Sequence, residues 1–589
     1  MFKPKMTMRL HQIHRGGVLL VLSLLLMPLS ACAQGSMKIP SMTSSKASDL
    51  ENAPVNKQKP FNLESPVLTE SALTVALQAG KIDKVRFFDA PGMKAFYTAR
   101  NFEPVWIENA FYKNRKIEPM LSVLENSWKH GLNPNHYNLI EIRDLMENAK
   151  GAERYKLDLV VSDALVRYGR DMSAMRVDPK AIGQKSRYWR QPLRGIDVLD
   201  YVSTHDDYTS AMNNMAPRGK LYKTLQAELL KLYKTSGEAT HPKVKITRAL
   251  TPGTTDKTVL SIRRRMGFAT DSKLSAHHFY DDELAAAVMA FQQSHGLKQD
   301  GIVGKQTAKI MNITHEQKLK QVLANMERLR WVTQNKPDRY IMVNVPSATL
   351  WAVENGDVKI EMPVVVGREE RPTNIFSTQV DGIRFNPTWT VPPTIKKDDY
   401  LPKLRKNPYY LSDRGIELKK GGKTVDPGTI DWKNKTWAEV NAMRMVQGSG
   451  ARNPLGRVRF LMNNPFNIYL HDTPNKSYFK KSDRALSSGC VRLERPVELA
   501  DFVMKGKNGW TQEKRVEVLK AGKMRDIYVE NKIPVYILYQ TVWLGDNNQL
   551  VYGADLYGHD DRLIAALKAQ DAIAAPAQEK PTETALNIQ

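Results

Sequence analysis

The chain has 589 residues, more than one hydrophobic core usually supports, so its length argues against a single-domain protein and predicts several domains. A hydrophobic fraction of 42% and a charged fraction of 25% are ordinary for a soluble globular protein. The 87 Lys and Arg residues outnumber the 62 Asp and Glu residues, which favours anionic partners or positive charge spread over a large surface. No long Lys/Arg block is present, so we expect no nucleic-acid partner.

The N-terminus has the layout of an export signal. Basic residues precede an apolar run over residues 16–29, which suits the core of a signal peptide but is shorter than the ~20 residues that span a bilayer. The run ends at Leu29-Ser30-Ala31-Cys32, a sequence typical of a bacterial lipobox, in which cleavage precedes Cys32 and its thiol carries a lipid. Ordinary cleavage or an uncleaved anchor stays open. We expect a signal peptide over 1–32, a periplasmic or cell-envelope location and membrane attachment through a lipid on Cys32.

The chain contains two cysteines, Cys32 and Cys490. If Cys32 is removed or lipidated, the mature body cannot form an internal disulfide. A lone thiol in an oxidising compartment is a candidate nucleophile, whereas its alternative role is that of a small buried hydrophobe.

Residues 33–67 are rich in Ser, Pro, Lys and Asn and predict a flexible tether. From 68 to 249 the pattern is mostly helical. Its clearest helix covers 155–172, where apolar residues follow the 3.6-residue period and charged residues lie opposite. We interpret the apolar stripe as core rather than as a cofactor site; it comprises Leu157, Val161, Ala164, Leu165, Tyr168 and Met172.

A compact helical unit is predicted over 250–314. Asp281 and Asp282 are placed to cap a helix that closes at His295-Gly296, where glycine can adopt a left-handed cap. Turns follow at Asp300-Gly301 and Val303-Gly304, and a short helix begins near Lys305. The pair His277-His278 is expected in a solvated loop rather than in a metal site.

A connecting helix is expected over 315–339, and the period then changes to two, which predicts strands. Asn355-Gly356 between two apolar stretches is a strong hairpin signal. The polar residues 394–447, punctuated by Gly and Pro, predict a lid inserted into a domain over 340–545. Residues 546–589 are assigned to a C-terminal tail. Further strands are predicted over 364–367, 383–389, 457–462, 467–471 and 535–539.

The candidate chemistry lies in His471 and in the stretch Ser487-Ser488-Gly489-Cys490-Val491-Arg492. A thiol attacks carbonyl groups as the thiolate, so it needs a base or a cation beside it. A histidine can accept the thiol proton and return it to a leaving amine. Backbone N–H groups around Gly489 and Cys490 can bind the oxyanion of a tetrahedral intermediate. Taken alone, a His and a Cys at this spacing are weak evidence.

His471 followed by Ser487-x-Gly489-Cys490-x-Arg492 resembles the signature of the L,D-transpeptidase catalytic domain, a mostly-β fold. Val366-Gly367 and Pro454-Leu455-Gly456 match its other recurrent pieces. The segment 250–314 resembles the small three-helix peptidoglycan-binding domain of wall enzymes, with a helical module that has lost ligand affinity as its alternative.

Together with the helical region, these parts resemble the large YcbB-type murein L,D-transpeptidases over most of the chain. The implied fold class is multidomain α+β: a helical N-terminal scaffold region, a small three-helix peptidoglycan-binding domain, and a mostly-β L,D-transpeptidase catalytic domain with an inserted lid.

Two positions depart from the commonest signature: Ser488 where His is usual, and Arg492 where Asn is usual. Both fit the large-enzyme subgroup. Because a second catalytic His is then absent, the resemblance implies that backbone donors at Ser488 and Gly489 carry more of the oxyanion role. Arg492 is expected to bind a substrate carboxylate or to form an internal ion pair. Asp472 is one candidate to orient His471, but adjacent strand residues face opposite ways, so a backbone carbonyl is the better one.

The resemblance implies that Cys490, with His471 as general base and acid, attacks the carbonyl of diaminopimelate in a tetrapeptide stem of peptidoglycan. D-alanine leaves, a thioester remains, and the amine of an acceptor stem then forms a 3→3 cross-link. No metal and no cofactor are expected. The implied partners are the donor and acceptor stems, a D,D-carboxypeptidase that prepares the donor, and other wall synthases.

Three other functions are weighed against this one. Water as acceptor would make the protein an L,D-carboxypeptidase. A non-catalytic peptidoglycan-binding scaffold would be free to lose His471 or Cys490, and both are present. A cysteine hydrolase of the papain or NlpC type would usually place Cys before His, whereas here His comes first.

Overall fold

The computed structural model describes residues 70–107, 115–178, 182–183, 190–235, 242–332, 334–545 and 548–570. The expected signal peptide with Cys32 and the expected tether over 33–67 lie outside the described residues. Within those ranges, no helix has both the length and the apolar character to cross a membrane.

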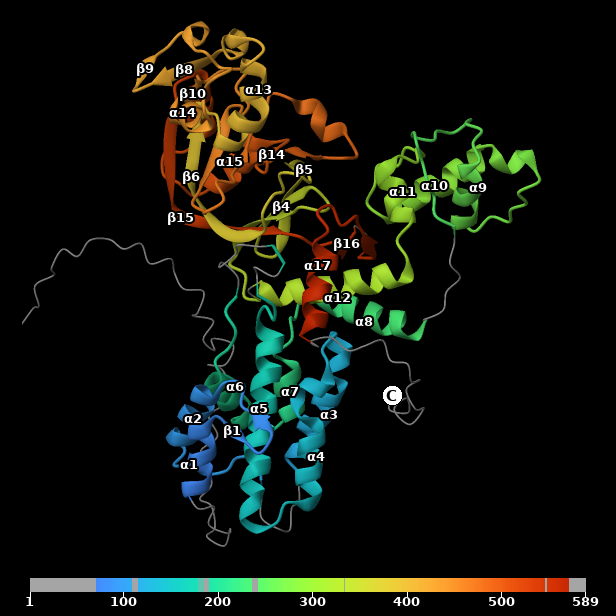
Figure 1. Ribbon diagram of the computed structural model, residues 1–589, viewed down its shortest axis with the longest axis vertical. Helices are drawn as coiled ribbons and strands as arrows, with labels where there is room; N and C mark the ends of the chain where they lie inside the picture. Colours follow the sequence, from blue (N-terminus) through green and yellow to red (C-terminus); the bar gives the residue numbers. More distant parts are fainter. Residues whose placement is uncertain are drawn as a thin grey trace, which may run out of the picture. The chain divides into compact units, whose positions relative to one another are not determined.

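Residues 70–216 form a helical region around one hydrophobic core (Figure 1), whereas the buried residues of the following helix, over 220–234, belong to the core that also contains residues 322–567. A two-stranded ribbon joins its first two helices, and the last helix packs against the helix that follows the next unit of the chain. The elements are α1 (Glu70–Ala79), β1 (Lys81–Ile82), β2 (Val85–Arg86), α2 (Ala90–Ala99), α3 (Ile117–Glu125), α4 (Leu139–Asn148), α5 (Arg154–Ser173), α6 (Gly195–Ser203), α7 (Tyr208–Asn213) and α8 (Lys220–Lys234).

Helix α5 confirms the helix predicted over 155–172, and all six residues of its apolar stripe are buried. Polar residues of the opposite face, Asp158, Ser162 and Asp163, are buried as well. Their polar groups are paired: the Asp158 carboxylate accepts backbone N–H groups from Val105 and Trp106 at 2.9 and 2.7 Å. Tertiary hydrogen bonds therefore allow the whole circumference of this helix to be buried.

The unit over 242–314 contains α9 (Thr258–Arg265), α10 (Asp282–Ser294) and α11 (Lys305–Met311) around a small core of its own. Asp281 confirms the predicted cap, since its carboxylate accepts the N–H of Leu284 at 2.9 Å. Gly296 has φ +60°, the left-handed conformation expected after the helix. His277 lies in a short 3-10 helix, where its Nδ1 accepts the N–H of Asp271 at 2.8 Å.

Helix α12 (His315–Trp331) follows directly and opens with a capping box between Thr314 and Gln317. It leads into a nine-stranded sheet with the order β13-β5-β14-β12-β11-β6-β15-β3-β4. Because β4 also pairs with β5, all of these strands except β13 form a closed ring. Figure 1 shows the long strands β6 and β15 side by side in this sheet. The strands are β3 (Arg339–Asn344), β4 (Thr349–Glu354), β5 (Asp357–Gly367), β6 (Phe376–Phe385), β11 (Val458–Met462), β12 (Leu470–His471), β13 (Ala485–Ser487), β14 (Val491–Leu493) and β15 (Arg525–Leu538).

The sheet follows from its sequence pattern at several points. Asn355 and Gly356, with φ +54° and +85°, form the predicted hairpin turn between β4 and β5. The strand predicted over 467–471 is shorter than expected, because only Leu470 and His471 pair with neighbours. Helices α15 (Pro496–Met504) and α16 (Gln512–Lys520) add apolar residues to the same core.

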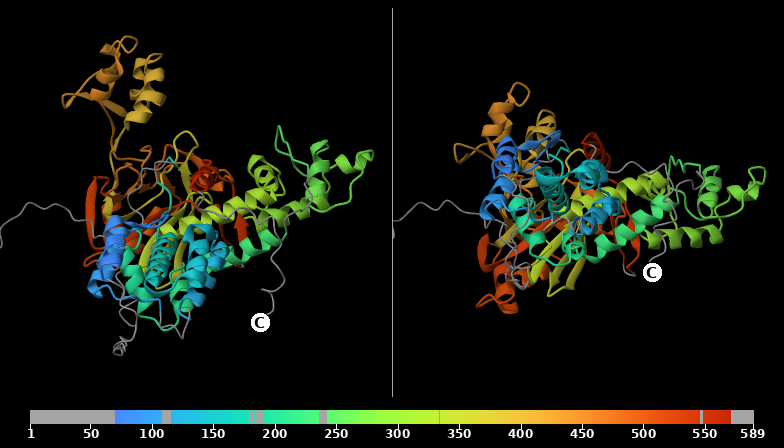
Figure 2. Two further views of the ribbon diagram at one scale, coloured as in Figure 1. Left: turned by 60° about the horizontal axis from the view of Figure 1, so that its bottom comes forward. Right: turned by 90° about the horizontal axis from the view of Figure 1, so that it is seen from below.

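Between β6 and β11 the chain builds a second, smaller sheet with a separate hydrophobic cluster. Figure 2 shows this segment as a lobe of its own. Its sheet has the order β7-β10-β8-β9, and a π-helical turn, η6 (Ile395–Tyr400), runs into α13. The remaining elements are β7 (Trp389–Thr390), α13 (Leu401–Leu404), β8 (Ile416–Lys420), β9 (Lys423–Thr424), α14 (Trp437–Ala442) and β10 (Arg444–Gln447).

The C-terminal segment corrects one prediction. Residues 548–570, which the sequence analysis assigned to a tail, contain β17 (Leu550–Tyr552), paired with β16 (Val542–Leu544), and α17 (His559–Ala569). Leu563, Ile564 and Leu567 are buried in the core of the large sheet, and this burial holds the segment in place.

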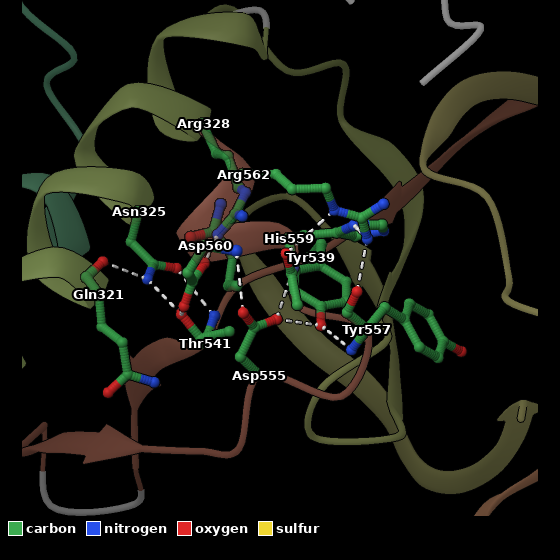
Figure 3. A network of polar contacts seen from close by, with 12 residues as sticks. Gln321, Asn325, Arg328, Tyr539, Thr541, Asp555, Tyr557, His559, Asp560 and Arg562 are labelled. Atoms are coloured by element: carbon green, nitrogen blue, oxygen red, sulfur yellow. Dashed lines mark hydrogen bonds and ion pairs between the residues drawn. The ribbon is translucent and has the colours of Figure 1, made fainter. Parts of the chain in front are cut away.

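A buried polar network ties the C-terminal segment to α12 (Figure 3). Arg328 of α12 forms an ion pair with Asp560 of α17 at 2.5 Å. Asn325, one turn earlier, donates to the hydroxyl of Thr541 at 2.7 Å, and that hydroxyl donates to Asp560 at 2.7 Å. Asp555 accepts the hydroxyl of Tyr539 at 2.6 Å. The segment is therefore fixed by polar as well as apolar contacts.

Candidate active site

The pairing of β12 with β14 brings the two predicted catalytic residues together. These strands are parallel, with Leu470 opposite Val491 and His471 opposite Arg492. The register places Cys490, one residue before β14, beside Tyr469. Paired residues share a face of a sheet, as do alternate residues along one strand. Cys490 and His471 thus lie diagonally adjacent on one face.

His471 is buried, and the backbone holds its ring. Its Nδ1 lies 2.5 Å from the carbonyl oxygen of Asp472. A carbonyl oxygen can only accept, so Nδ1 carries the proton and Nε2 is left with a free lone pair. Burial and then the charge of Arg492 lower the pKa of His471 to about 3. The ring is therefore neutral at pH 7 and can accept a proton.

The carboxylate of Asp472 does not orient His471. It accepts the backbone N–H groups of Arg457 and Thr473 at 2.8 and 2.7 Å and the ammonium group of Lys476 at 2.8 Å. The orienting group is the backbone carbonyl, the better of the two candidates in the sequence. The carboxylate instead fixes the loop that follows β12.

Cys490 is partly exposed, and its Sγ donates to the carbonyl oxygen of Asn467 at 3.7 Å. Burial of the sulfur raises the pKa of the thiol, and the backbone of Tyr469 and the charges of Arg459 and Arg492 offset only part of this effect. At neutral pH the thiol is therefore protonated. In the described part of the chain, no hydrogen bond joins Sγ to the His471 ring.

The backbone before Cys490 has a left-handed glycine at its centre. Gly489 has φ +113°, a conformation that disfavours a side chain. Its N–H donates to the Ser487 hydroxyl at 3.0 Å, and that hydroxyl donates to the Cys490 carbonyl at 2.6 Å. The Gly489 N–H proposed as an oxyanion donor is therefore already engaged. The N–H groups of Ser488 and Cys490 form no hydrogen bond with any described residue, so they are the donors at hand.

A threonine and a tyrosine that the sequence analysis missed hold this loop from behind. The hydroxyl of Thr373 donates to the Gly489 carbonyl at 2.7 Å and accepts the Gly367 N–H at 2.8 Å. The hydroxyl of Tyr557 accepts the Thr373 N–H at 3.3 Å and donates to the Gly367 carbonyl at 2.5 Å. Tyr557 belongs to the C-terminal segment of Figure 3, which thus reaches the backbone beside Cys490. No local sequence signal marks either residue.

Ser488 connects the loop to the inserted lobe. Its hydroxyl accepts a hydrogen bond from Arg371 at 3.2 Å, and the same guanidinium pairs with Asp399 of η6 at 2.6 Å. Arg371 also pairs with Asp398 at 3.1 Å. Arg371 therefore links η6, through ion pairs, to Ser488, through a hydrogen bond.

Arg492 lies on the same face as Cys490 and His471. Its guanidinium lies 5.4 Å from the centre of the Tyr478 ring. Among the described residues it has no ion pair with a carboxylate, which argues against the internal ion pair that the sequence left open. The site residues thus comprise a neutral base, a thiol and an arginine available to an acidic ligand. In the same ranges, no three His, Cys, Asp or Glu side chains are grouped as metal ligands.

Comparison with known families separates the chain into three matched parts. Residues 338–518 match the family described as "L,D-transpeptidase catalytic domain". Residues 91–229 match the family described as "Scaffold domain", and residues 264–311 match the one described as "Putative peptidoglycan binding domain". The first range contains all five predicted site residues.

A curated relative from Haemophilus influenzae, named "Putative L,D-transpeptidase", is 35% identical over 263 residues, which are 44% of this chain and 51% of the relative. The chain thus spans about half the length of that relative.

Two solved structures also match at low similarity. An L,D-transpeptidase from Mycobacterium smegmatis is 10% identical with a TM-score of 0.17, covering 34% of this chain and 58% of that one. One from Stackebrandtia nassauensis is 14% identical with a TM-score of 0.17, covering 51% and 97%. At these TM-scores the likeness establishes neither fold nor function.

Proposed function

We propose that this chain, which carries an L,D-transpeptidase catalytic domain and a peptidoglycan-binding domain, cross-links peptidoglycan through a thioester on Cys490. The family match and the relative from Haemophilus influenzae support L,D-transpeptidase activity. The peptidoglycan-binding match supports peptidoglycan as the substrate.

One observation carries the assignment of the nucleophile. Cys490 and His471 lie on the same sheet face of adjacent strands, inside the range that matches the catalytic domain. His471 is held as the tautomer whose Nε2 can accept a proton. A rotation of the thiol away from the Asn467 carbonyl is the movement needed before proton transfer, and such bonds often tighten only when substrate is bound.

In the first step, His471 accepts the thiol proton and the sulfur attacks the carbonyl carbon of the third stem residue. The carbonyl oxygen becomes an oxyanion. We assign the N–H groups of Ser488 and Cys490 as the donors that bind it. Each such donor is worth about 3 kcal/mol in transition-state stabilisation. The carbon–nitrogen bond then breaks, His471 returns the proton to the leaving amine of D-alanine, and a thioester remains.

In the second step, the side-chain amine of an acceptor stem attacks the thioester carbonyl. His471 takes a proton from this amine, the carbon–sulfur bond breaks, and the thiol is restored as a 3→3 cross-link forms. Attack by water gives a tripeptide instead, which is L,D-carboxypeptidase activity. Arg492, without a carboxylate partner among the described residues, is suited to hold an acidic group of the stem.

The proposed setting is the bacterial cell envelope, with a lipid on Cys32 as membrane anchor. The lipobox-like sequence Leu29-Ser30-Ala31-Cys32 supports this anchor. A donor tetrapeptide requires prior removal of a fifth residue, so a D,D-carboxypeptidase is the expected supplier. Other wall synthases are expected to provide the acceptor strands.

The test uses the full chain purified in detergent and incubated with disaccharide-tetrapeptides, with products identified by mass spectrometry. Wild type, Cys490→Ala and His471→Gln are compared. His136→Gln is the matched control, because this partly exposed imidazole lies in the helical region. We expect 3→3 dimers with wild type and the control, and none with the other two variants.

The remaining outcomes separate the alternatives. Tripeptides without dimers from the wild type would support the carboxypeptidase. An unchanged substrate with all proteins would support the non-catalytic scaffold. Equal dimer formation by wild type and Cys490→Ala would remove Cys490 from the mechanism.

A further inference from the structure

A row of charged residues crosses the sheet through the active site. The pairings of five successive strands, β15, β6, β11, β12 and β14, place one residue from each in register on one face. In strand order these residues are Asp526, Arg384, Arg459, His471 and Arg492. Three guanidinium groups thus share the row with one carboxylate.

The carboxylate neutralises the arginine beside it. Arg384 donates to both oxygens of Asp526, at 2.7 and 2.6 Å, in a bidentate pair. Arg459, the next residue in the row, has no ion pair with any carboxylate of the described chain. Its guanidinium N–H groups donate no hydrogen bond to any described residue, and the Nε among them is buried. The guanidinium therefore keeps donors that an acidic ligand can use.

Arg459 lies next to the proposed catalytic residues. It is the register partner of His471, and its guanidinium lies 3.8 Å from the centre of the Tyr469 ring. Tyr469 in turn lies beside Cys490. Stacking on the ring fixes the guanidinium plane, while its edge remains open to hydrogen bonding. Arg459 is partly exposed, so a ligand can reach it.

The strand order determines which part of a substrate meets Arg459. Strands β14, β12 and β11 are adjacent in that order, with the nucleophile one residue before β14, the base on β12 and Arg459 on β11. A scissile bond must place its carbonyl carbon at Cys490 and its leaving nitrogen at His471. The leaving residue therefore extends toward β11. In a peptide ending with that residue, its α-carboxylate is only two bonds from the nitrogen.

We propose that Arg459 binds the terminal carboxylate of the donor stem and thereby selects peptides whose leaving residue is the last one. This inference rests on the proposed function and adds a specificity residue to it. A guanidinium can hold a carboxylate through two parallel hydrogen bonds, whereas an amide in its place offers one acceptor and two clashing donors.

The test compares two substrates with wild type and with a variant, using the full chain. Release of the leaving residue is measured as kcat/KM for a disaccharide-tetrapeptide and for its C-terminal carboxamide. With wild type, the carboxamide should react about 10- to 100-fold more slowly, which is the loss expected from a charge-assisted hydrogen-bonded pair. With Arg459→Gln, the acid substrate should slow by a similar factor, and the two substrates should then react at nearly equal rates.

Arg444→Gln serves as the charge control, because Arg444 is exposed on β10 of the inserted lobe. It should keep the full preference for the acid. Because the acid-to-amide ratio is measured within one variant, a smaller folded fraction of Arg459→Gln does not alter it.

A wild-type preference that persists unchanged in Arg459→Gln would overturn the inference. So would a wild type that does not distinguish acid from amide. If wild type releases nothing from the acid substrate, the proposed function itself fails, which is a separate and recognisable result.

Discussion

Two buried polar sites, one in the helical region and one in the large sheet, are completed in different ways. Asp158, in the second turn of α5, is fully buried, and its carboxylate accepts hydrogen bonds from the backbone N–H groups of Val105 and Trp106 and from the Tyr97 hydroxyl. On the sheet, the Arg459 guanidinium forms no hydrogen bond with any residue that the structure describes, and within the same residues His471 uses one ring nitrogen. The first site is saturated by the protein, whereas the second keeps capacity for a ligand.

The difference explains what each site does. A saturated carboxylate fixes the chain that it bonds, so Asp158 joins the segment around Trp106 to α5. An unsaturated guanidinium and a neutral imidazole beside a thiol contribute little to stability but are ready to interact with substrate. Changes at the sheet should therefore affect activity, and changes at α5 should affect stability.

The largest expected effect is on activity. His471→Gln should lower the release of the leaving residue by about 10²–10⁴-fold, because the general base is lost. Its thermal unfolding should shift little, since the ring makes one hydrogen bond to the backbone. Steady-state rates and a melting curve measure the two effects, with His136→Gln as control. A large loss of stability with retained activity would show that His471 has a structural role rather than a catalytic one.

The next effect is on stability. Asp158→Ala should destabilise the helical region by about 3–4 kcal/mol, because it leaves the backbone N–H groups of Val105, Trp106 and Ile107 without their acceptor. Hydrogen exchange of peptides over 154–173, followed by mass spectrometry, measures the loss of protection. The exposed Asp144→Ala on α4 is the matched control. Protection equal to that of wild type would show that the Asp158 bonds are not structural.

A smaller effect on activity is expected for Tyr557, a structural residue that supports the active-site loop. Tyr557→Phe removes the hydroxyl that bonds Thr373 and Gly367 behind the Cys490 loop. We expect kcat to fall by up to about 30-fold with little change in KM, because this hydroxyl makes two buried hydrogen bonds, each of about 1 kcal/mol, that position the loop. Tyr552→Phe is the control: it loses a bond to Glu228 and has no link to Thr373. Equal kcat values for both variants would limit Tyr557 to a structural role.

The smallest effect concerns the resting thiol. Because burial raises its pKa, Cys490 should react with iodoacetamide more slowly at pH 7 than free cysteine does. Its rate should still be rising above pH 9, where the thiolate of an ordinary cysteine is already largely formed. Mass spectrometry of the peptide containing Cys490 follows the reaction separately from Cys32. A rate plateau below pH 8 would indicate a preformed thiolate and contradict the neutral thiol–imidazole pair.

The same sites show which features could be predicted from the sequence and which could not. Cys490 and His471 were identifiable because they stand in a short motif, and the helix α10 with its Asp281 cap follows from local periodicity. Arg459 was not identifiable, because its place beside His471 depends on the register in which β11 pairs with β12, and the sequence pattern does not give that register.

The same limit applies to the groups behind the active site. Thr373 and Gly489 are 116 residues apart, and Tyr557 and Gly367 are 190 apart. Neither hydrogen bond leaves a local pattern. The burial of Asp158 was likewise missed, because periodicity reveals an apolar face but not tertiary partners that allow a polar face to be buried.

The central claim is that Cys490 carries the acyl group during turnover. The direct measurement is acid quenching of the full chain during reaction with a disaccharide-tetrapeptide, followed by mass spectrometry of its peptides. The account predicts a disaccharide-tripeptide bound to the peptide that contains Cys490, present in wild type and absent in Cys490→Ala. Release of D-alanine at the full rate by Cys490→Ala, or an adduct on another residue in wild type, would contradict it.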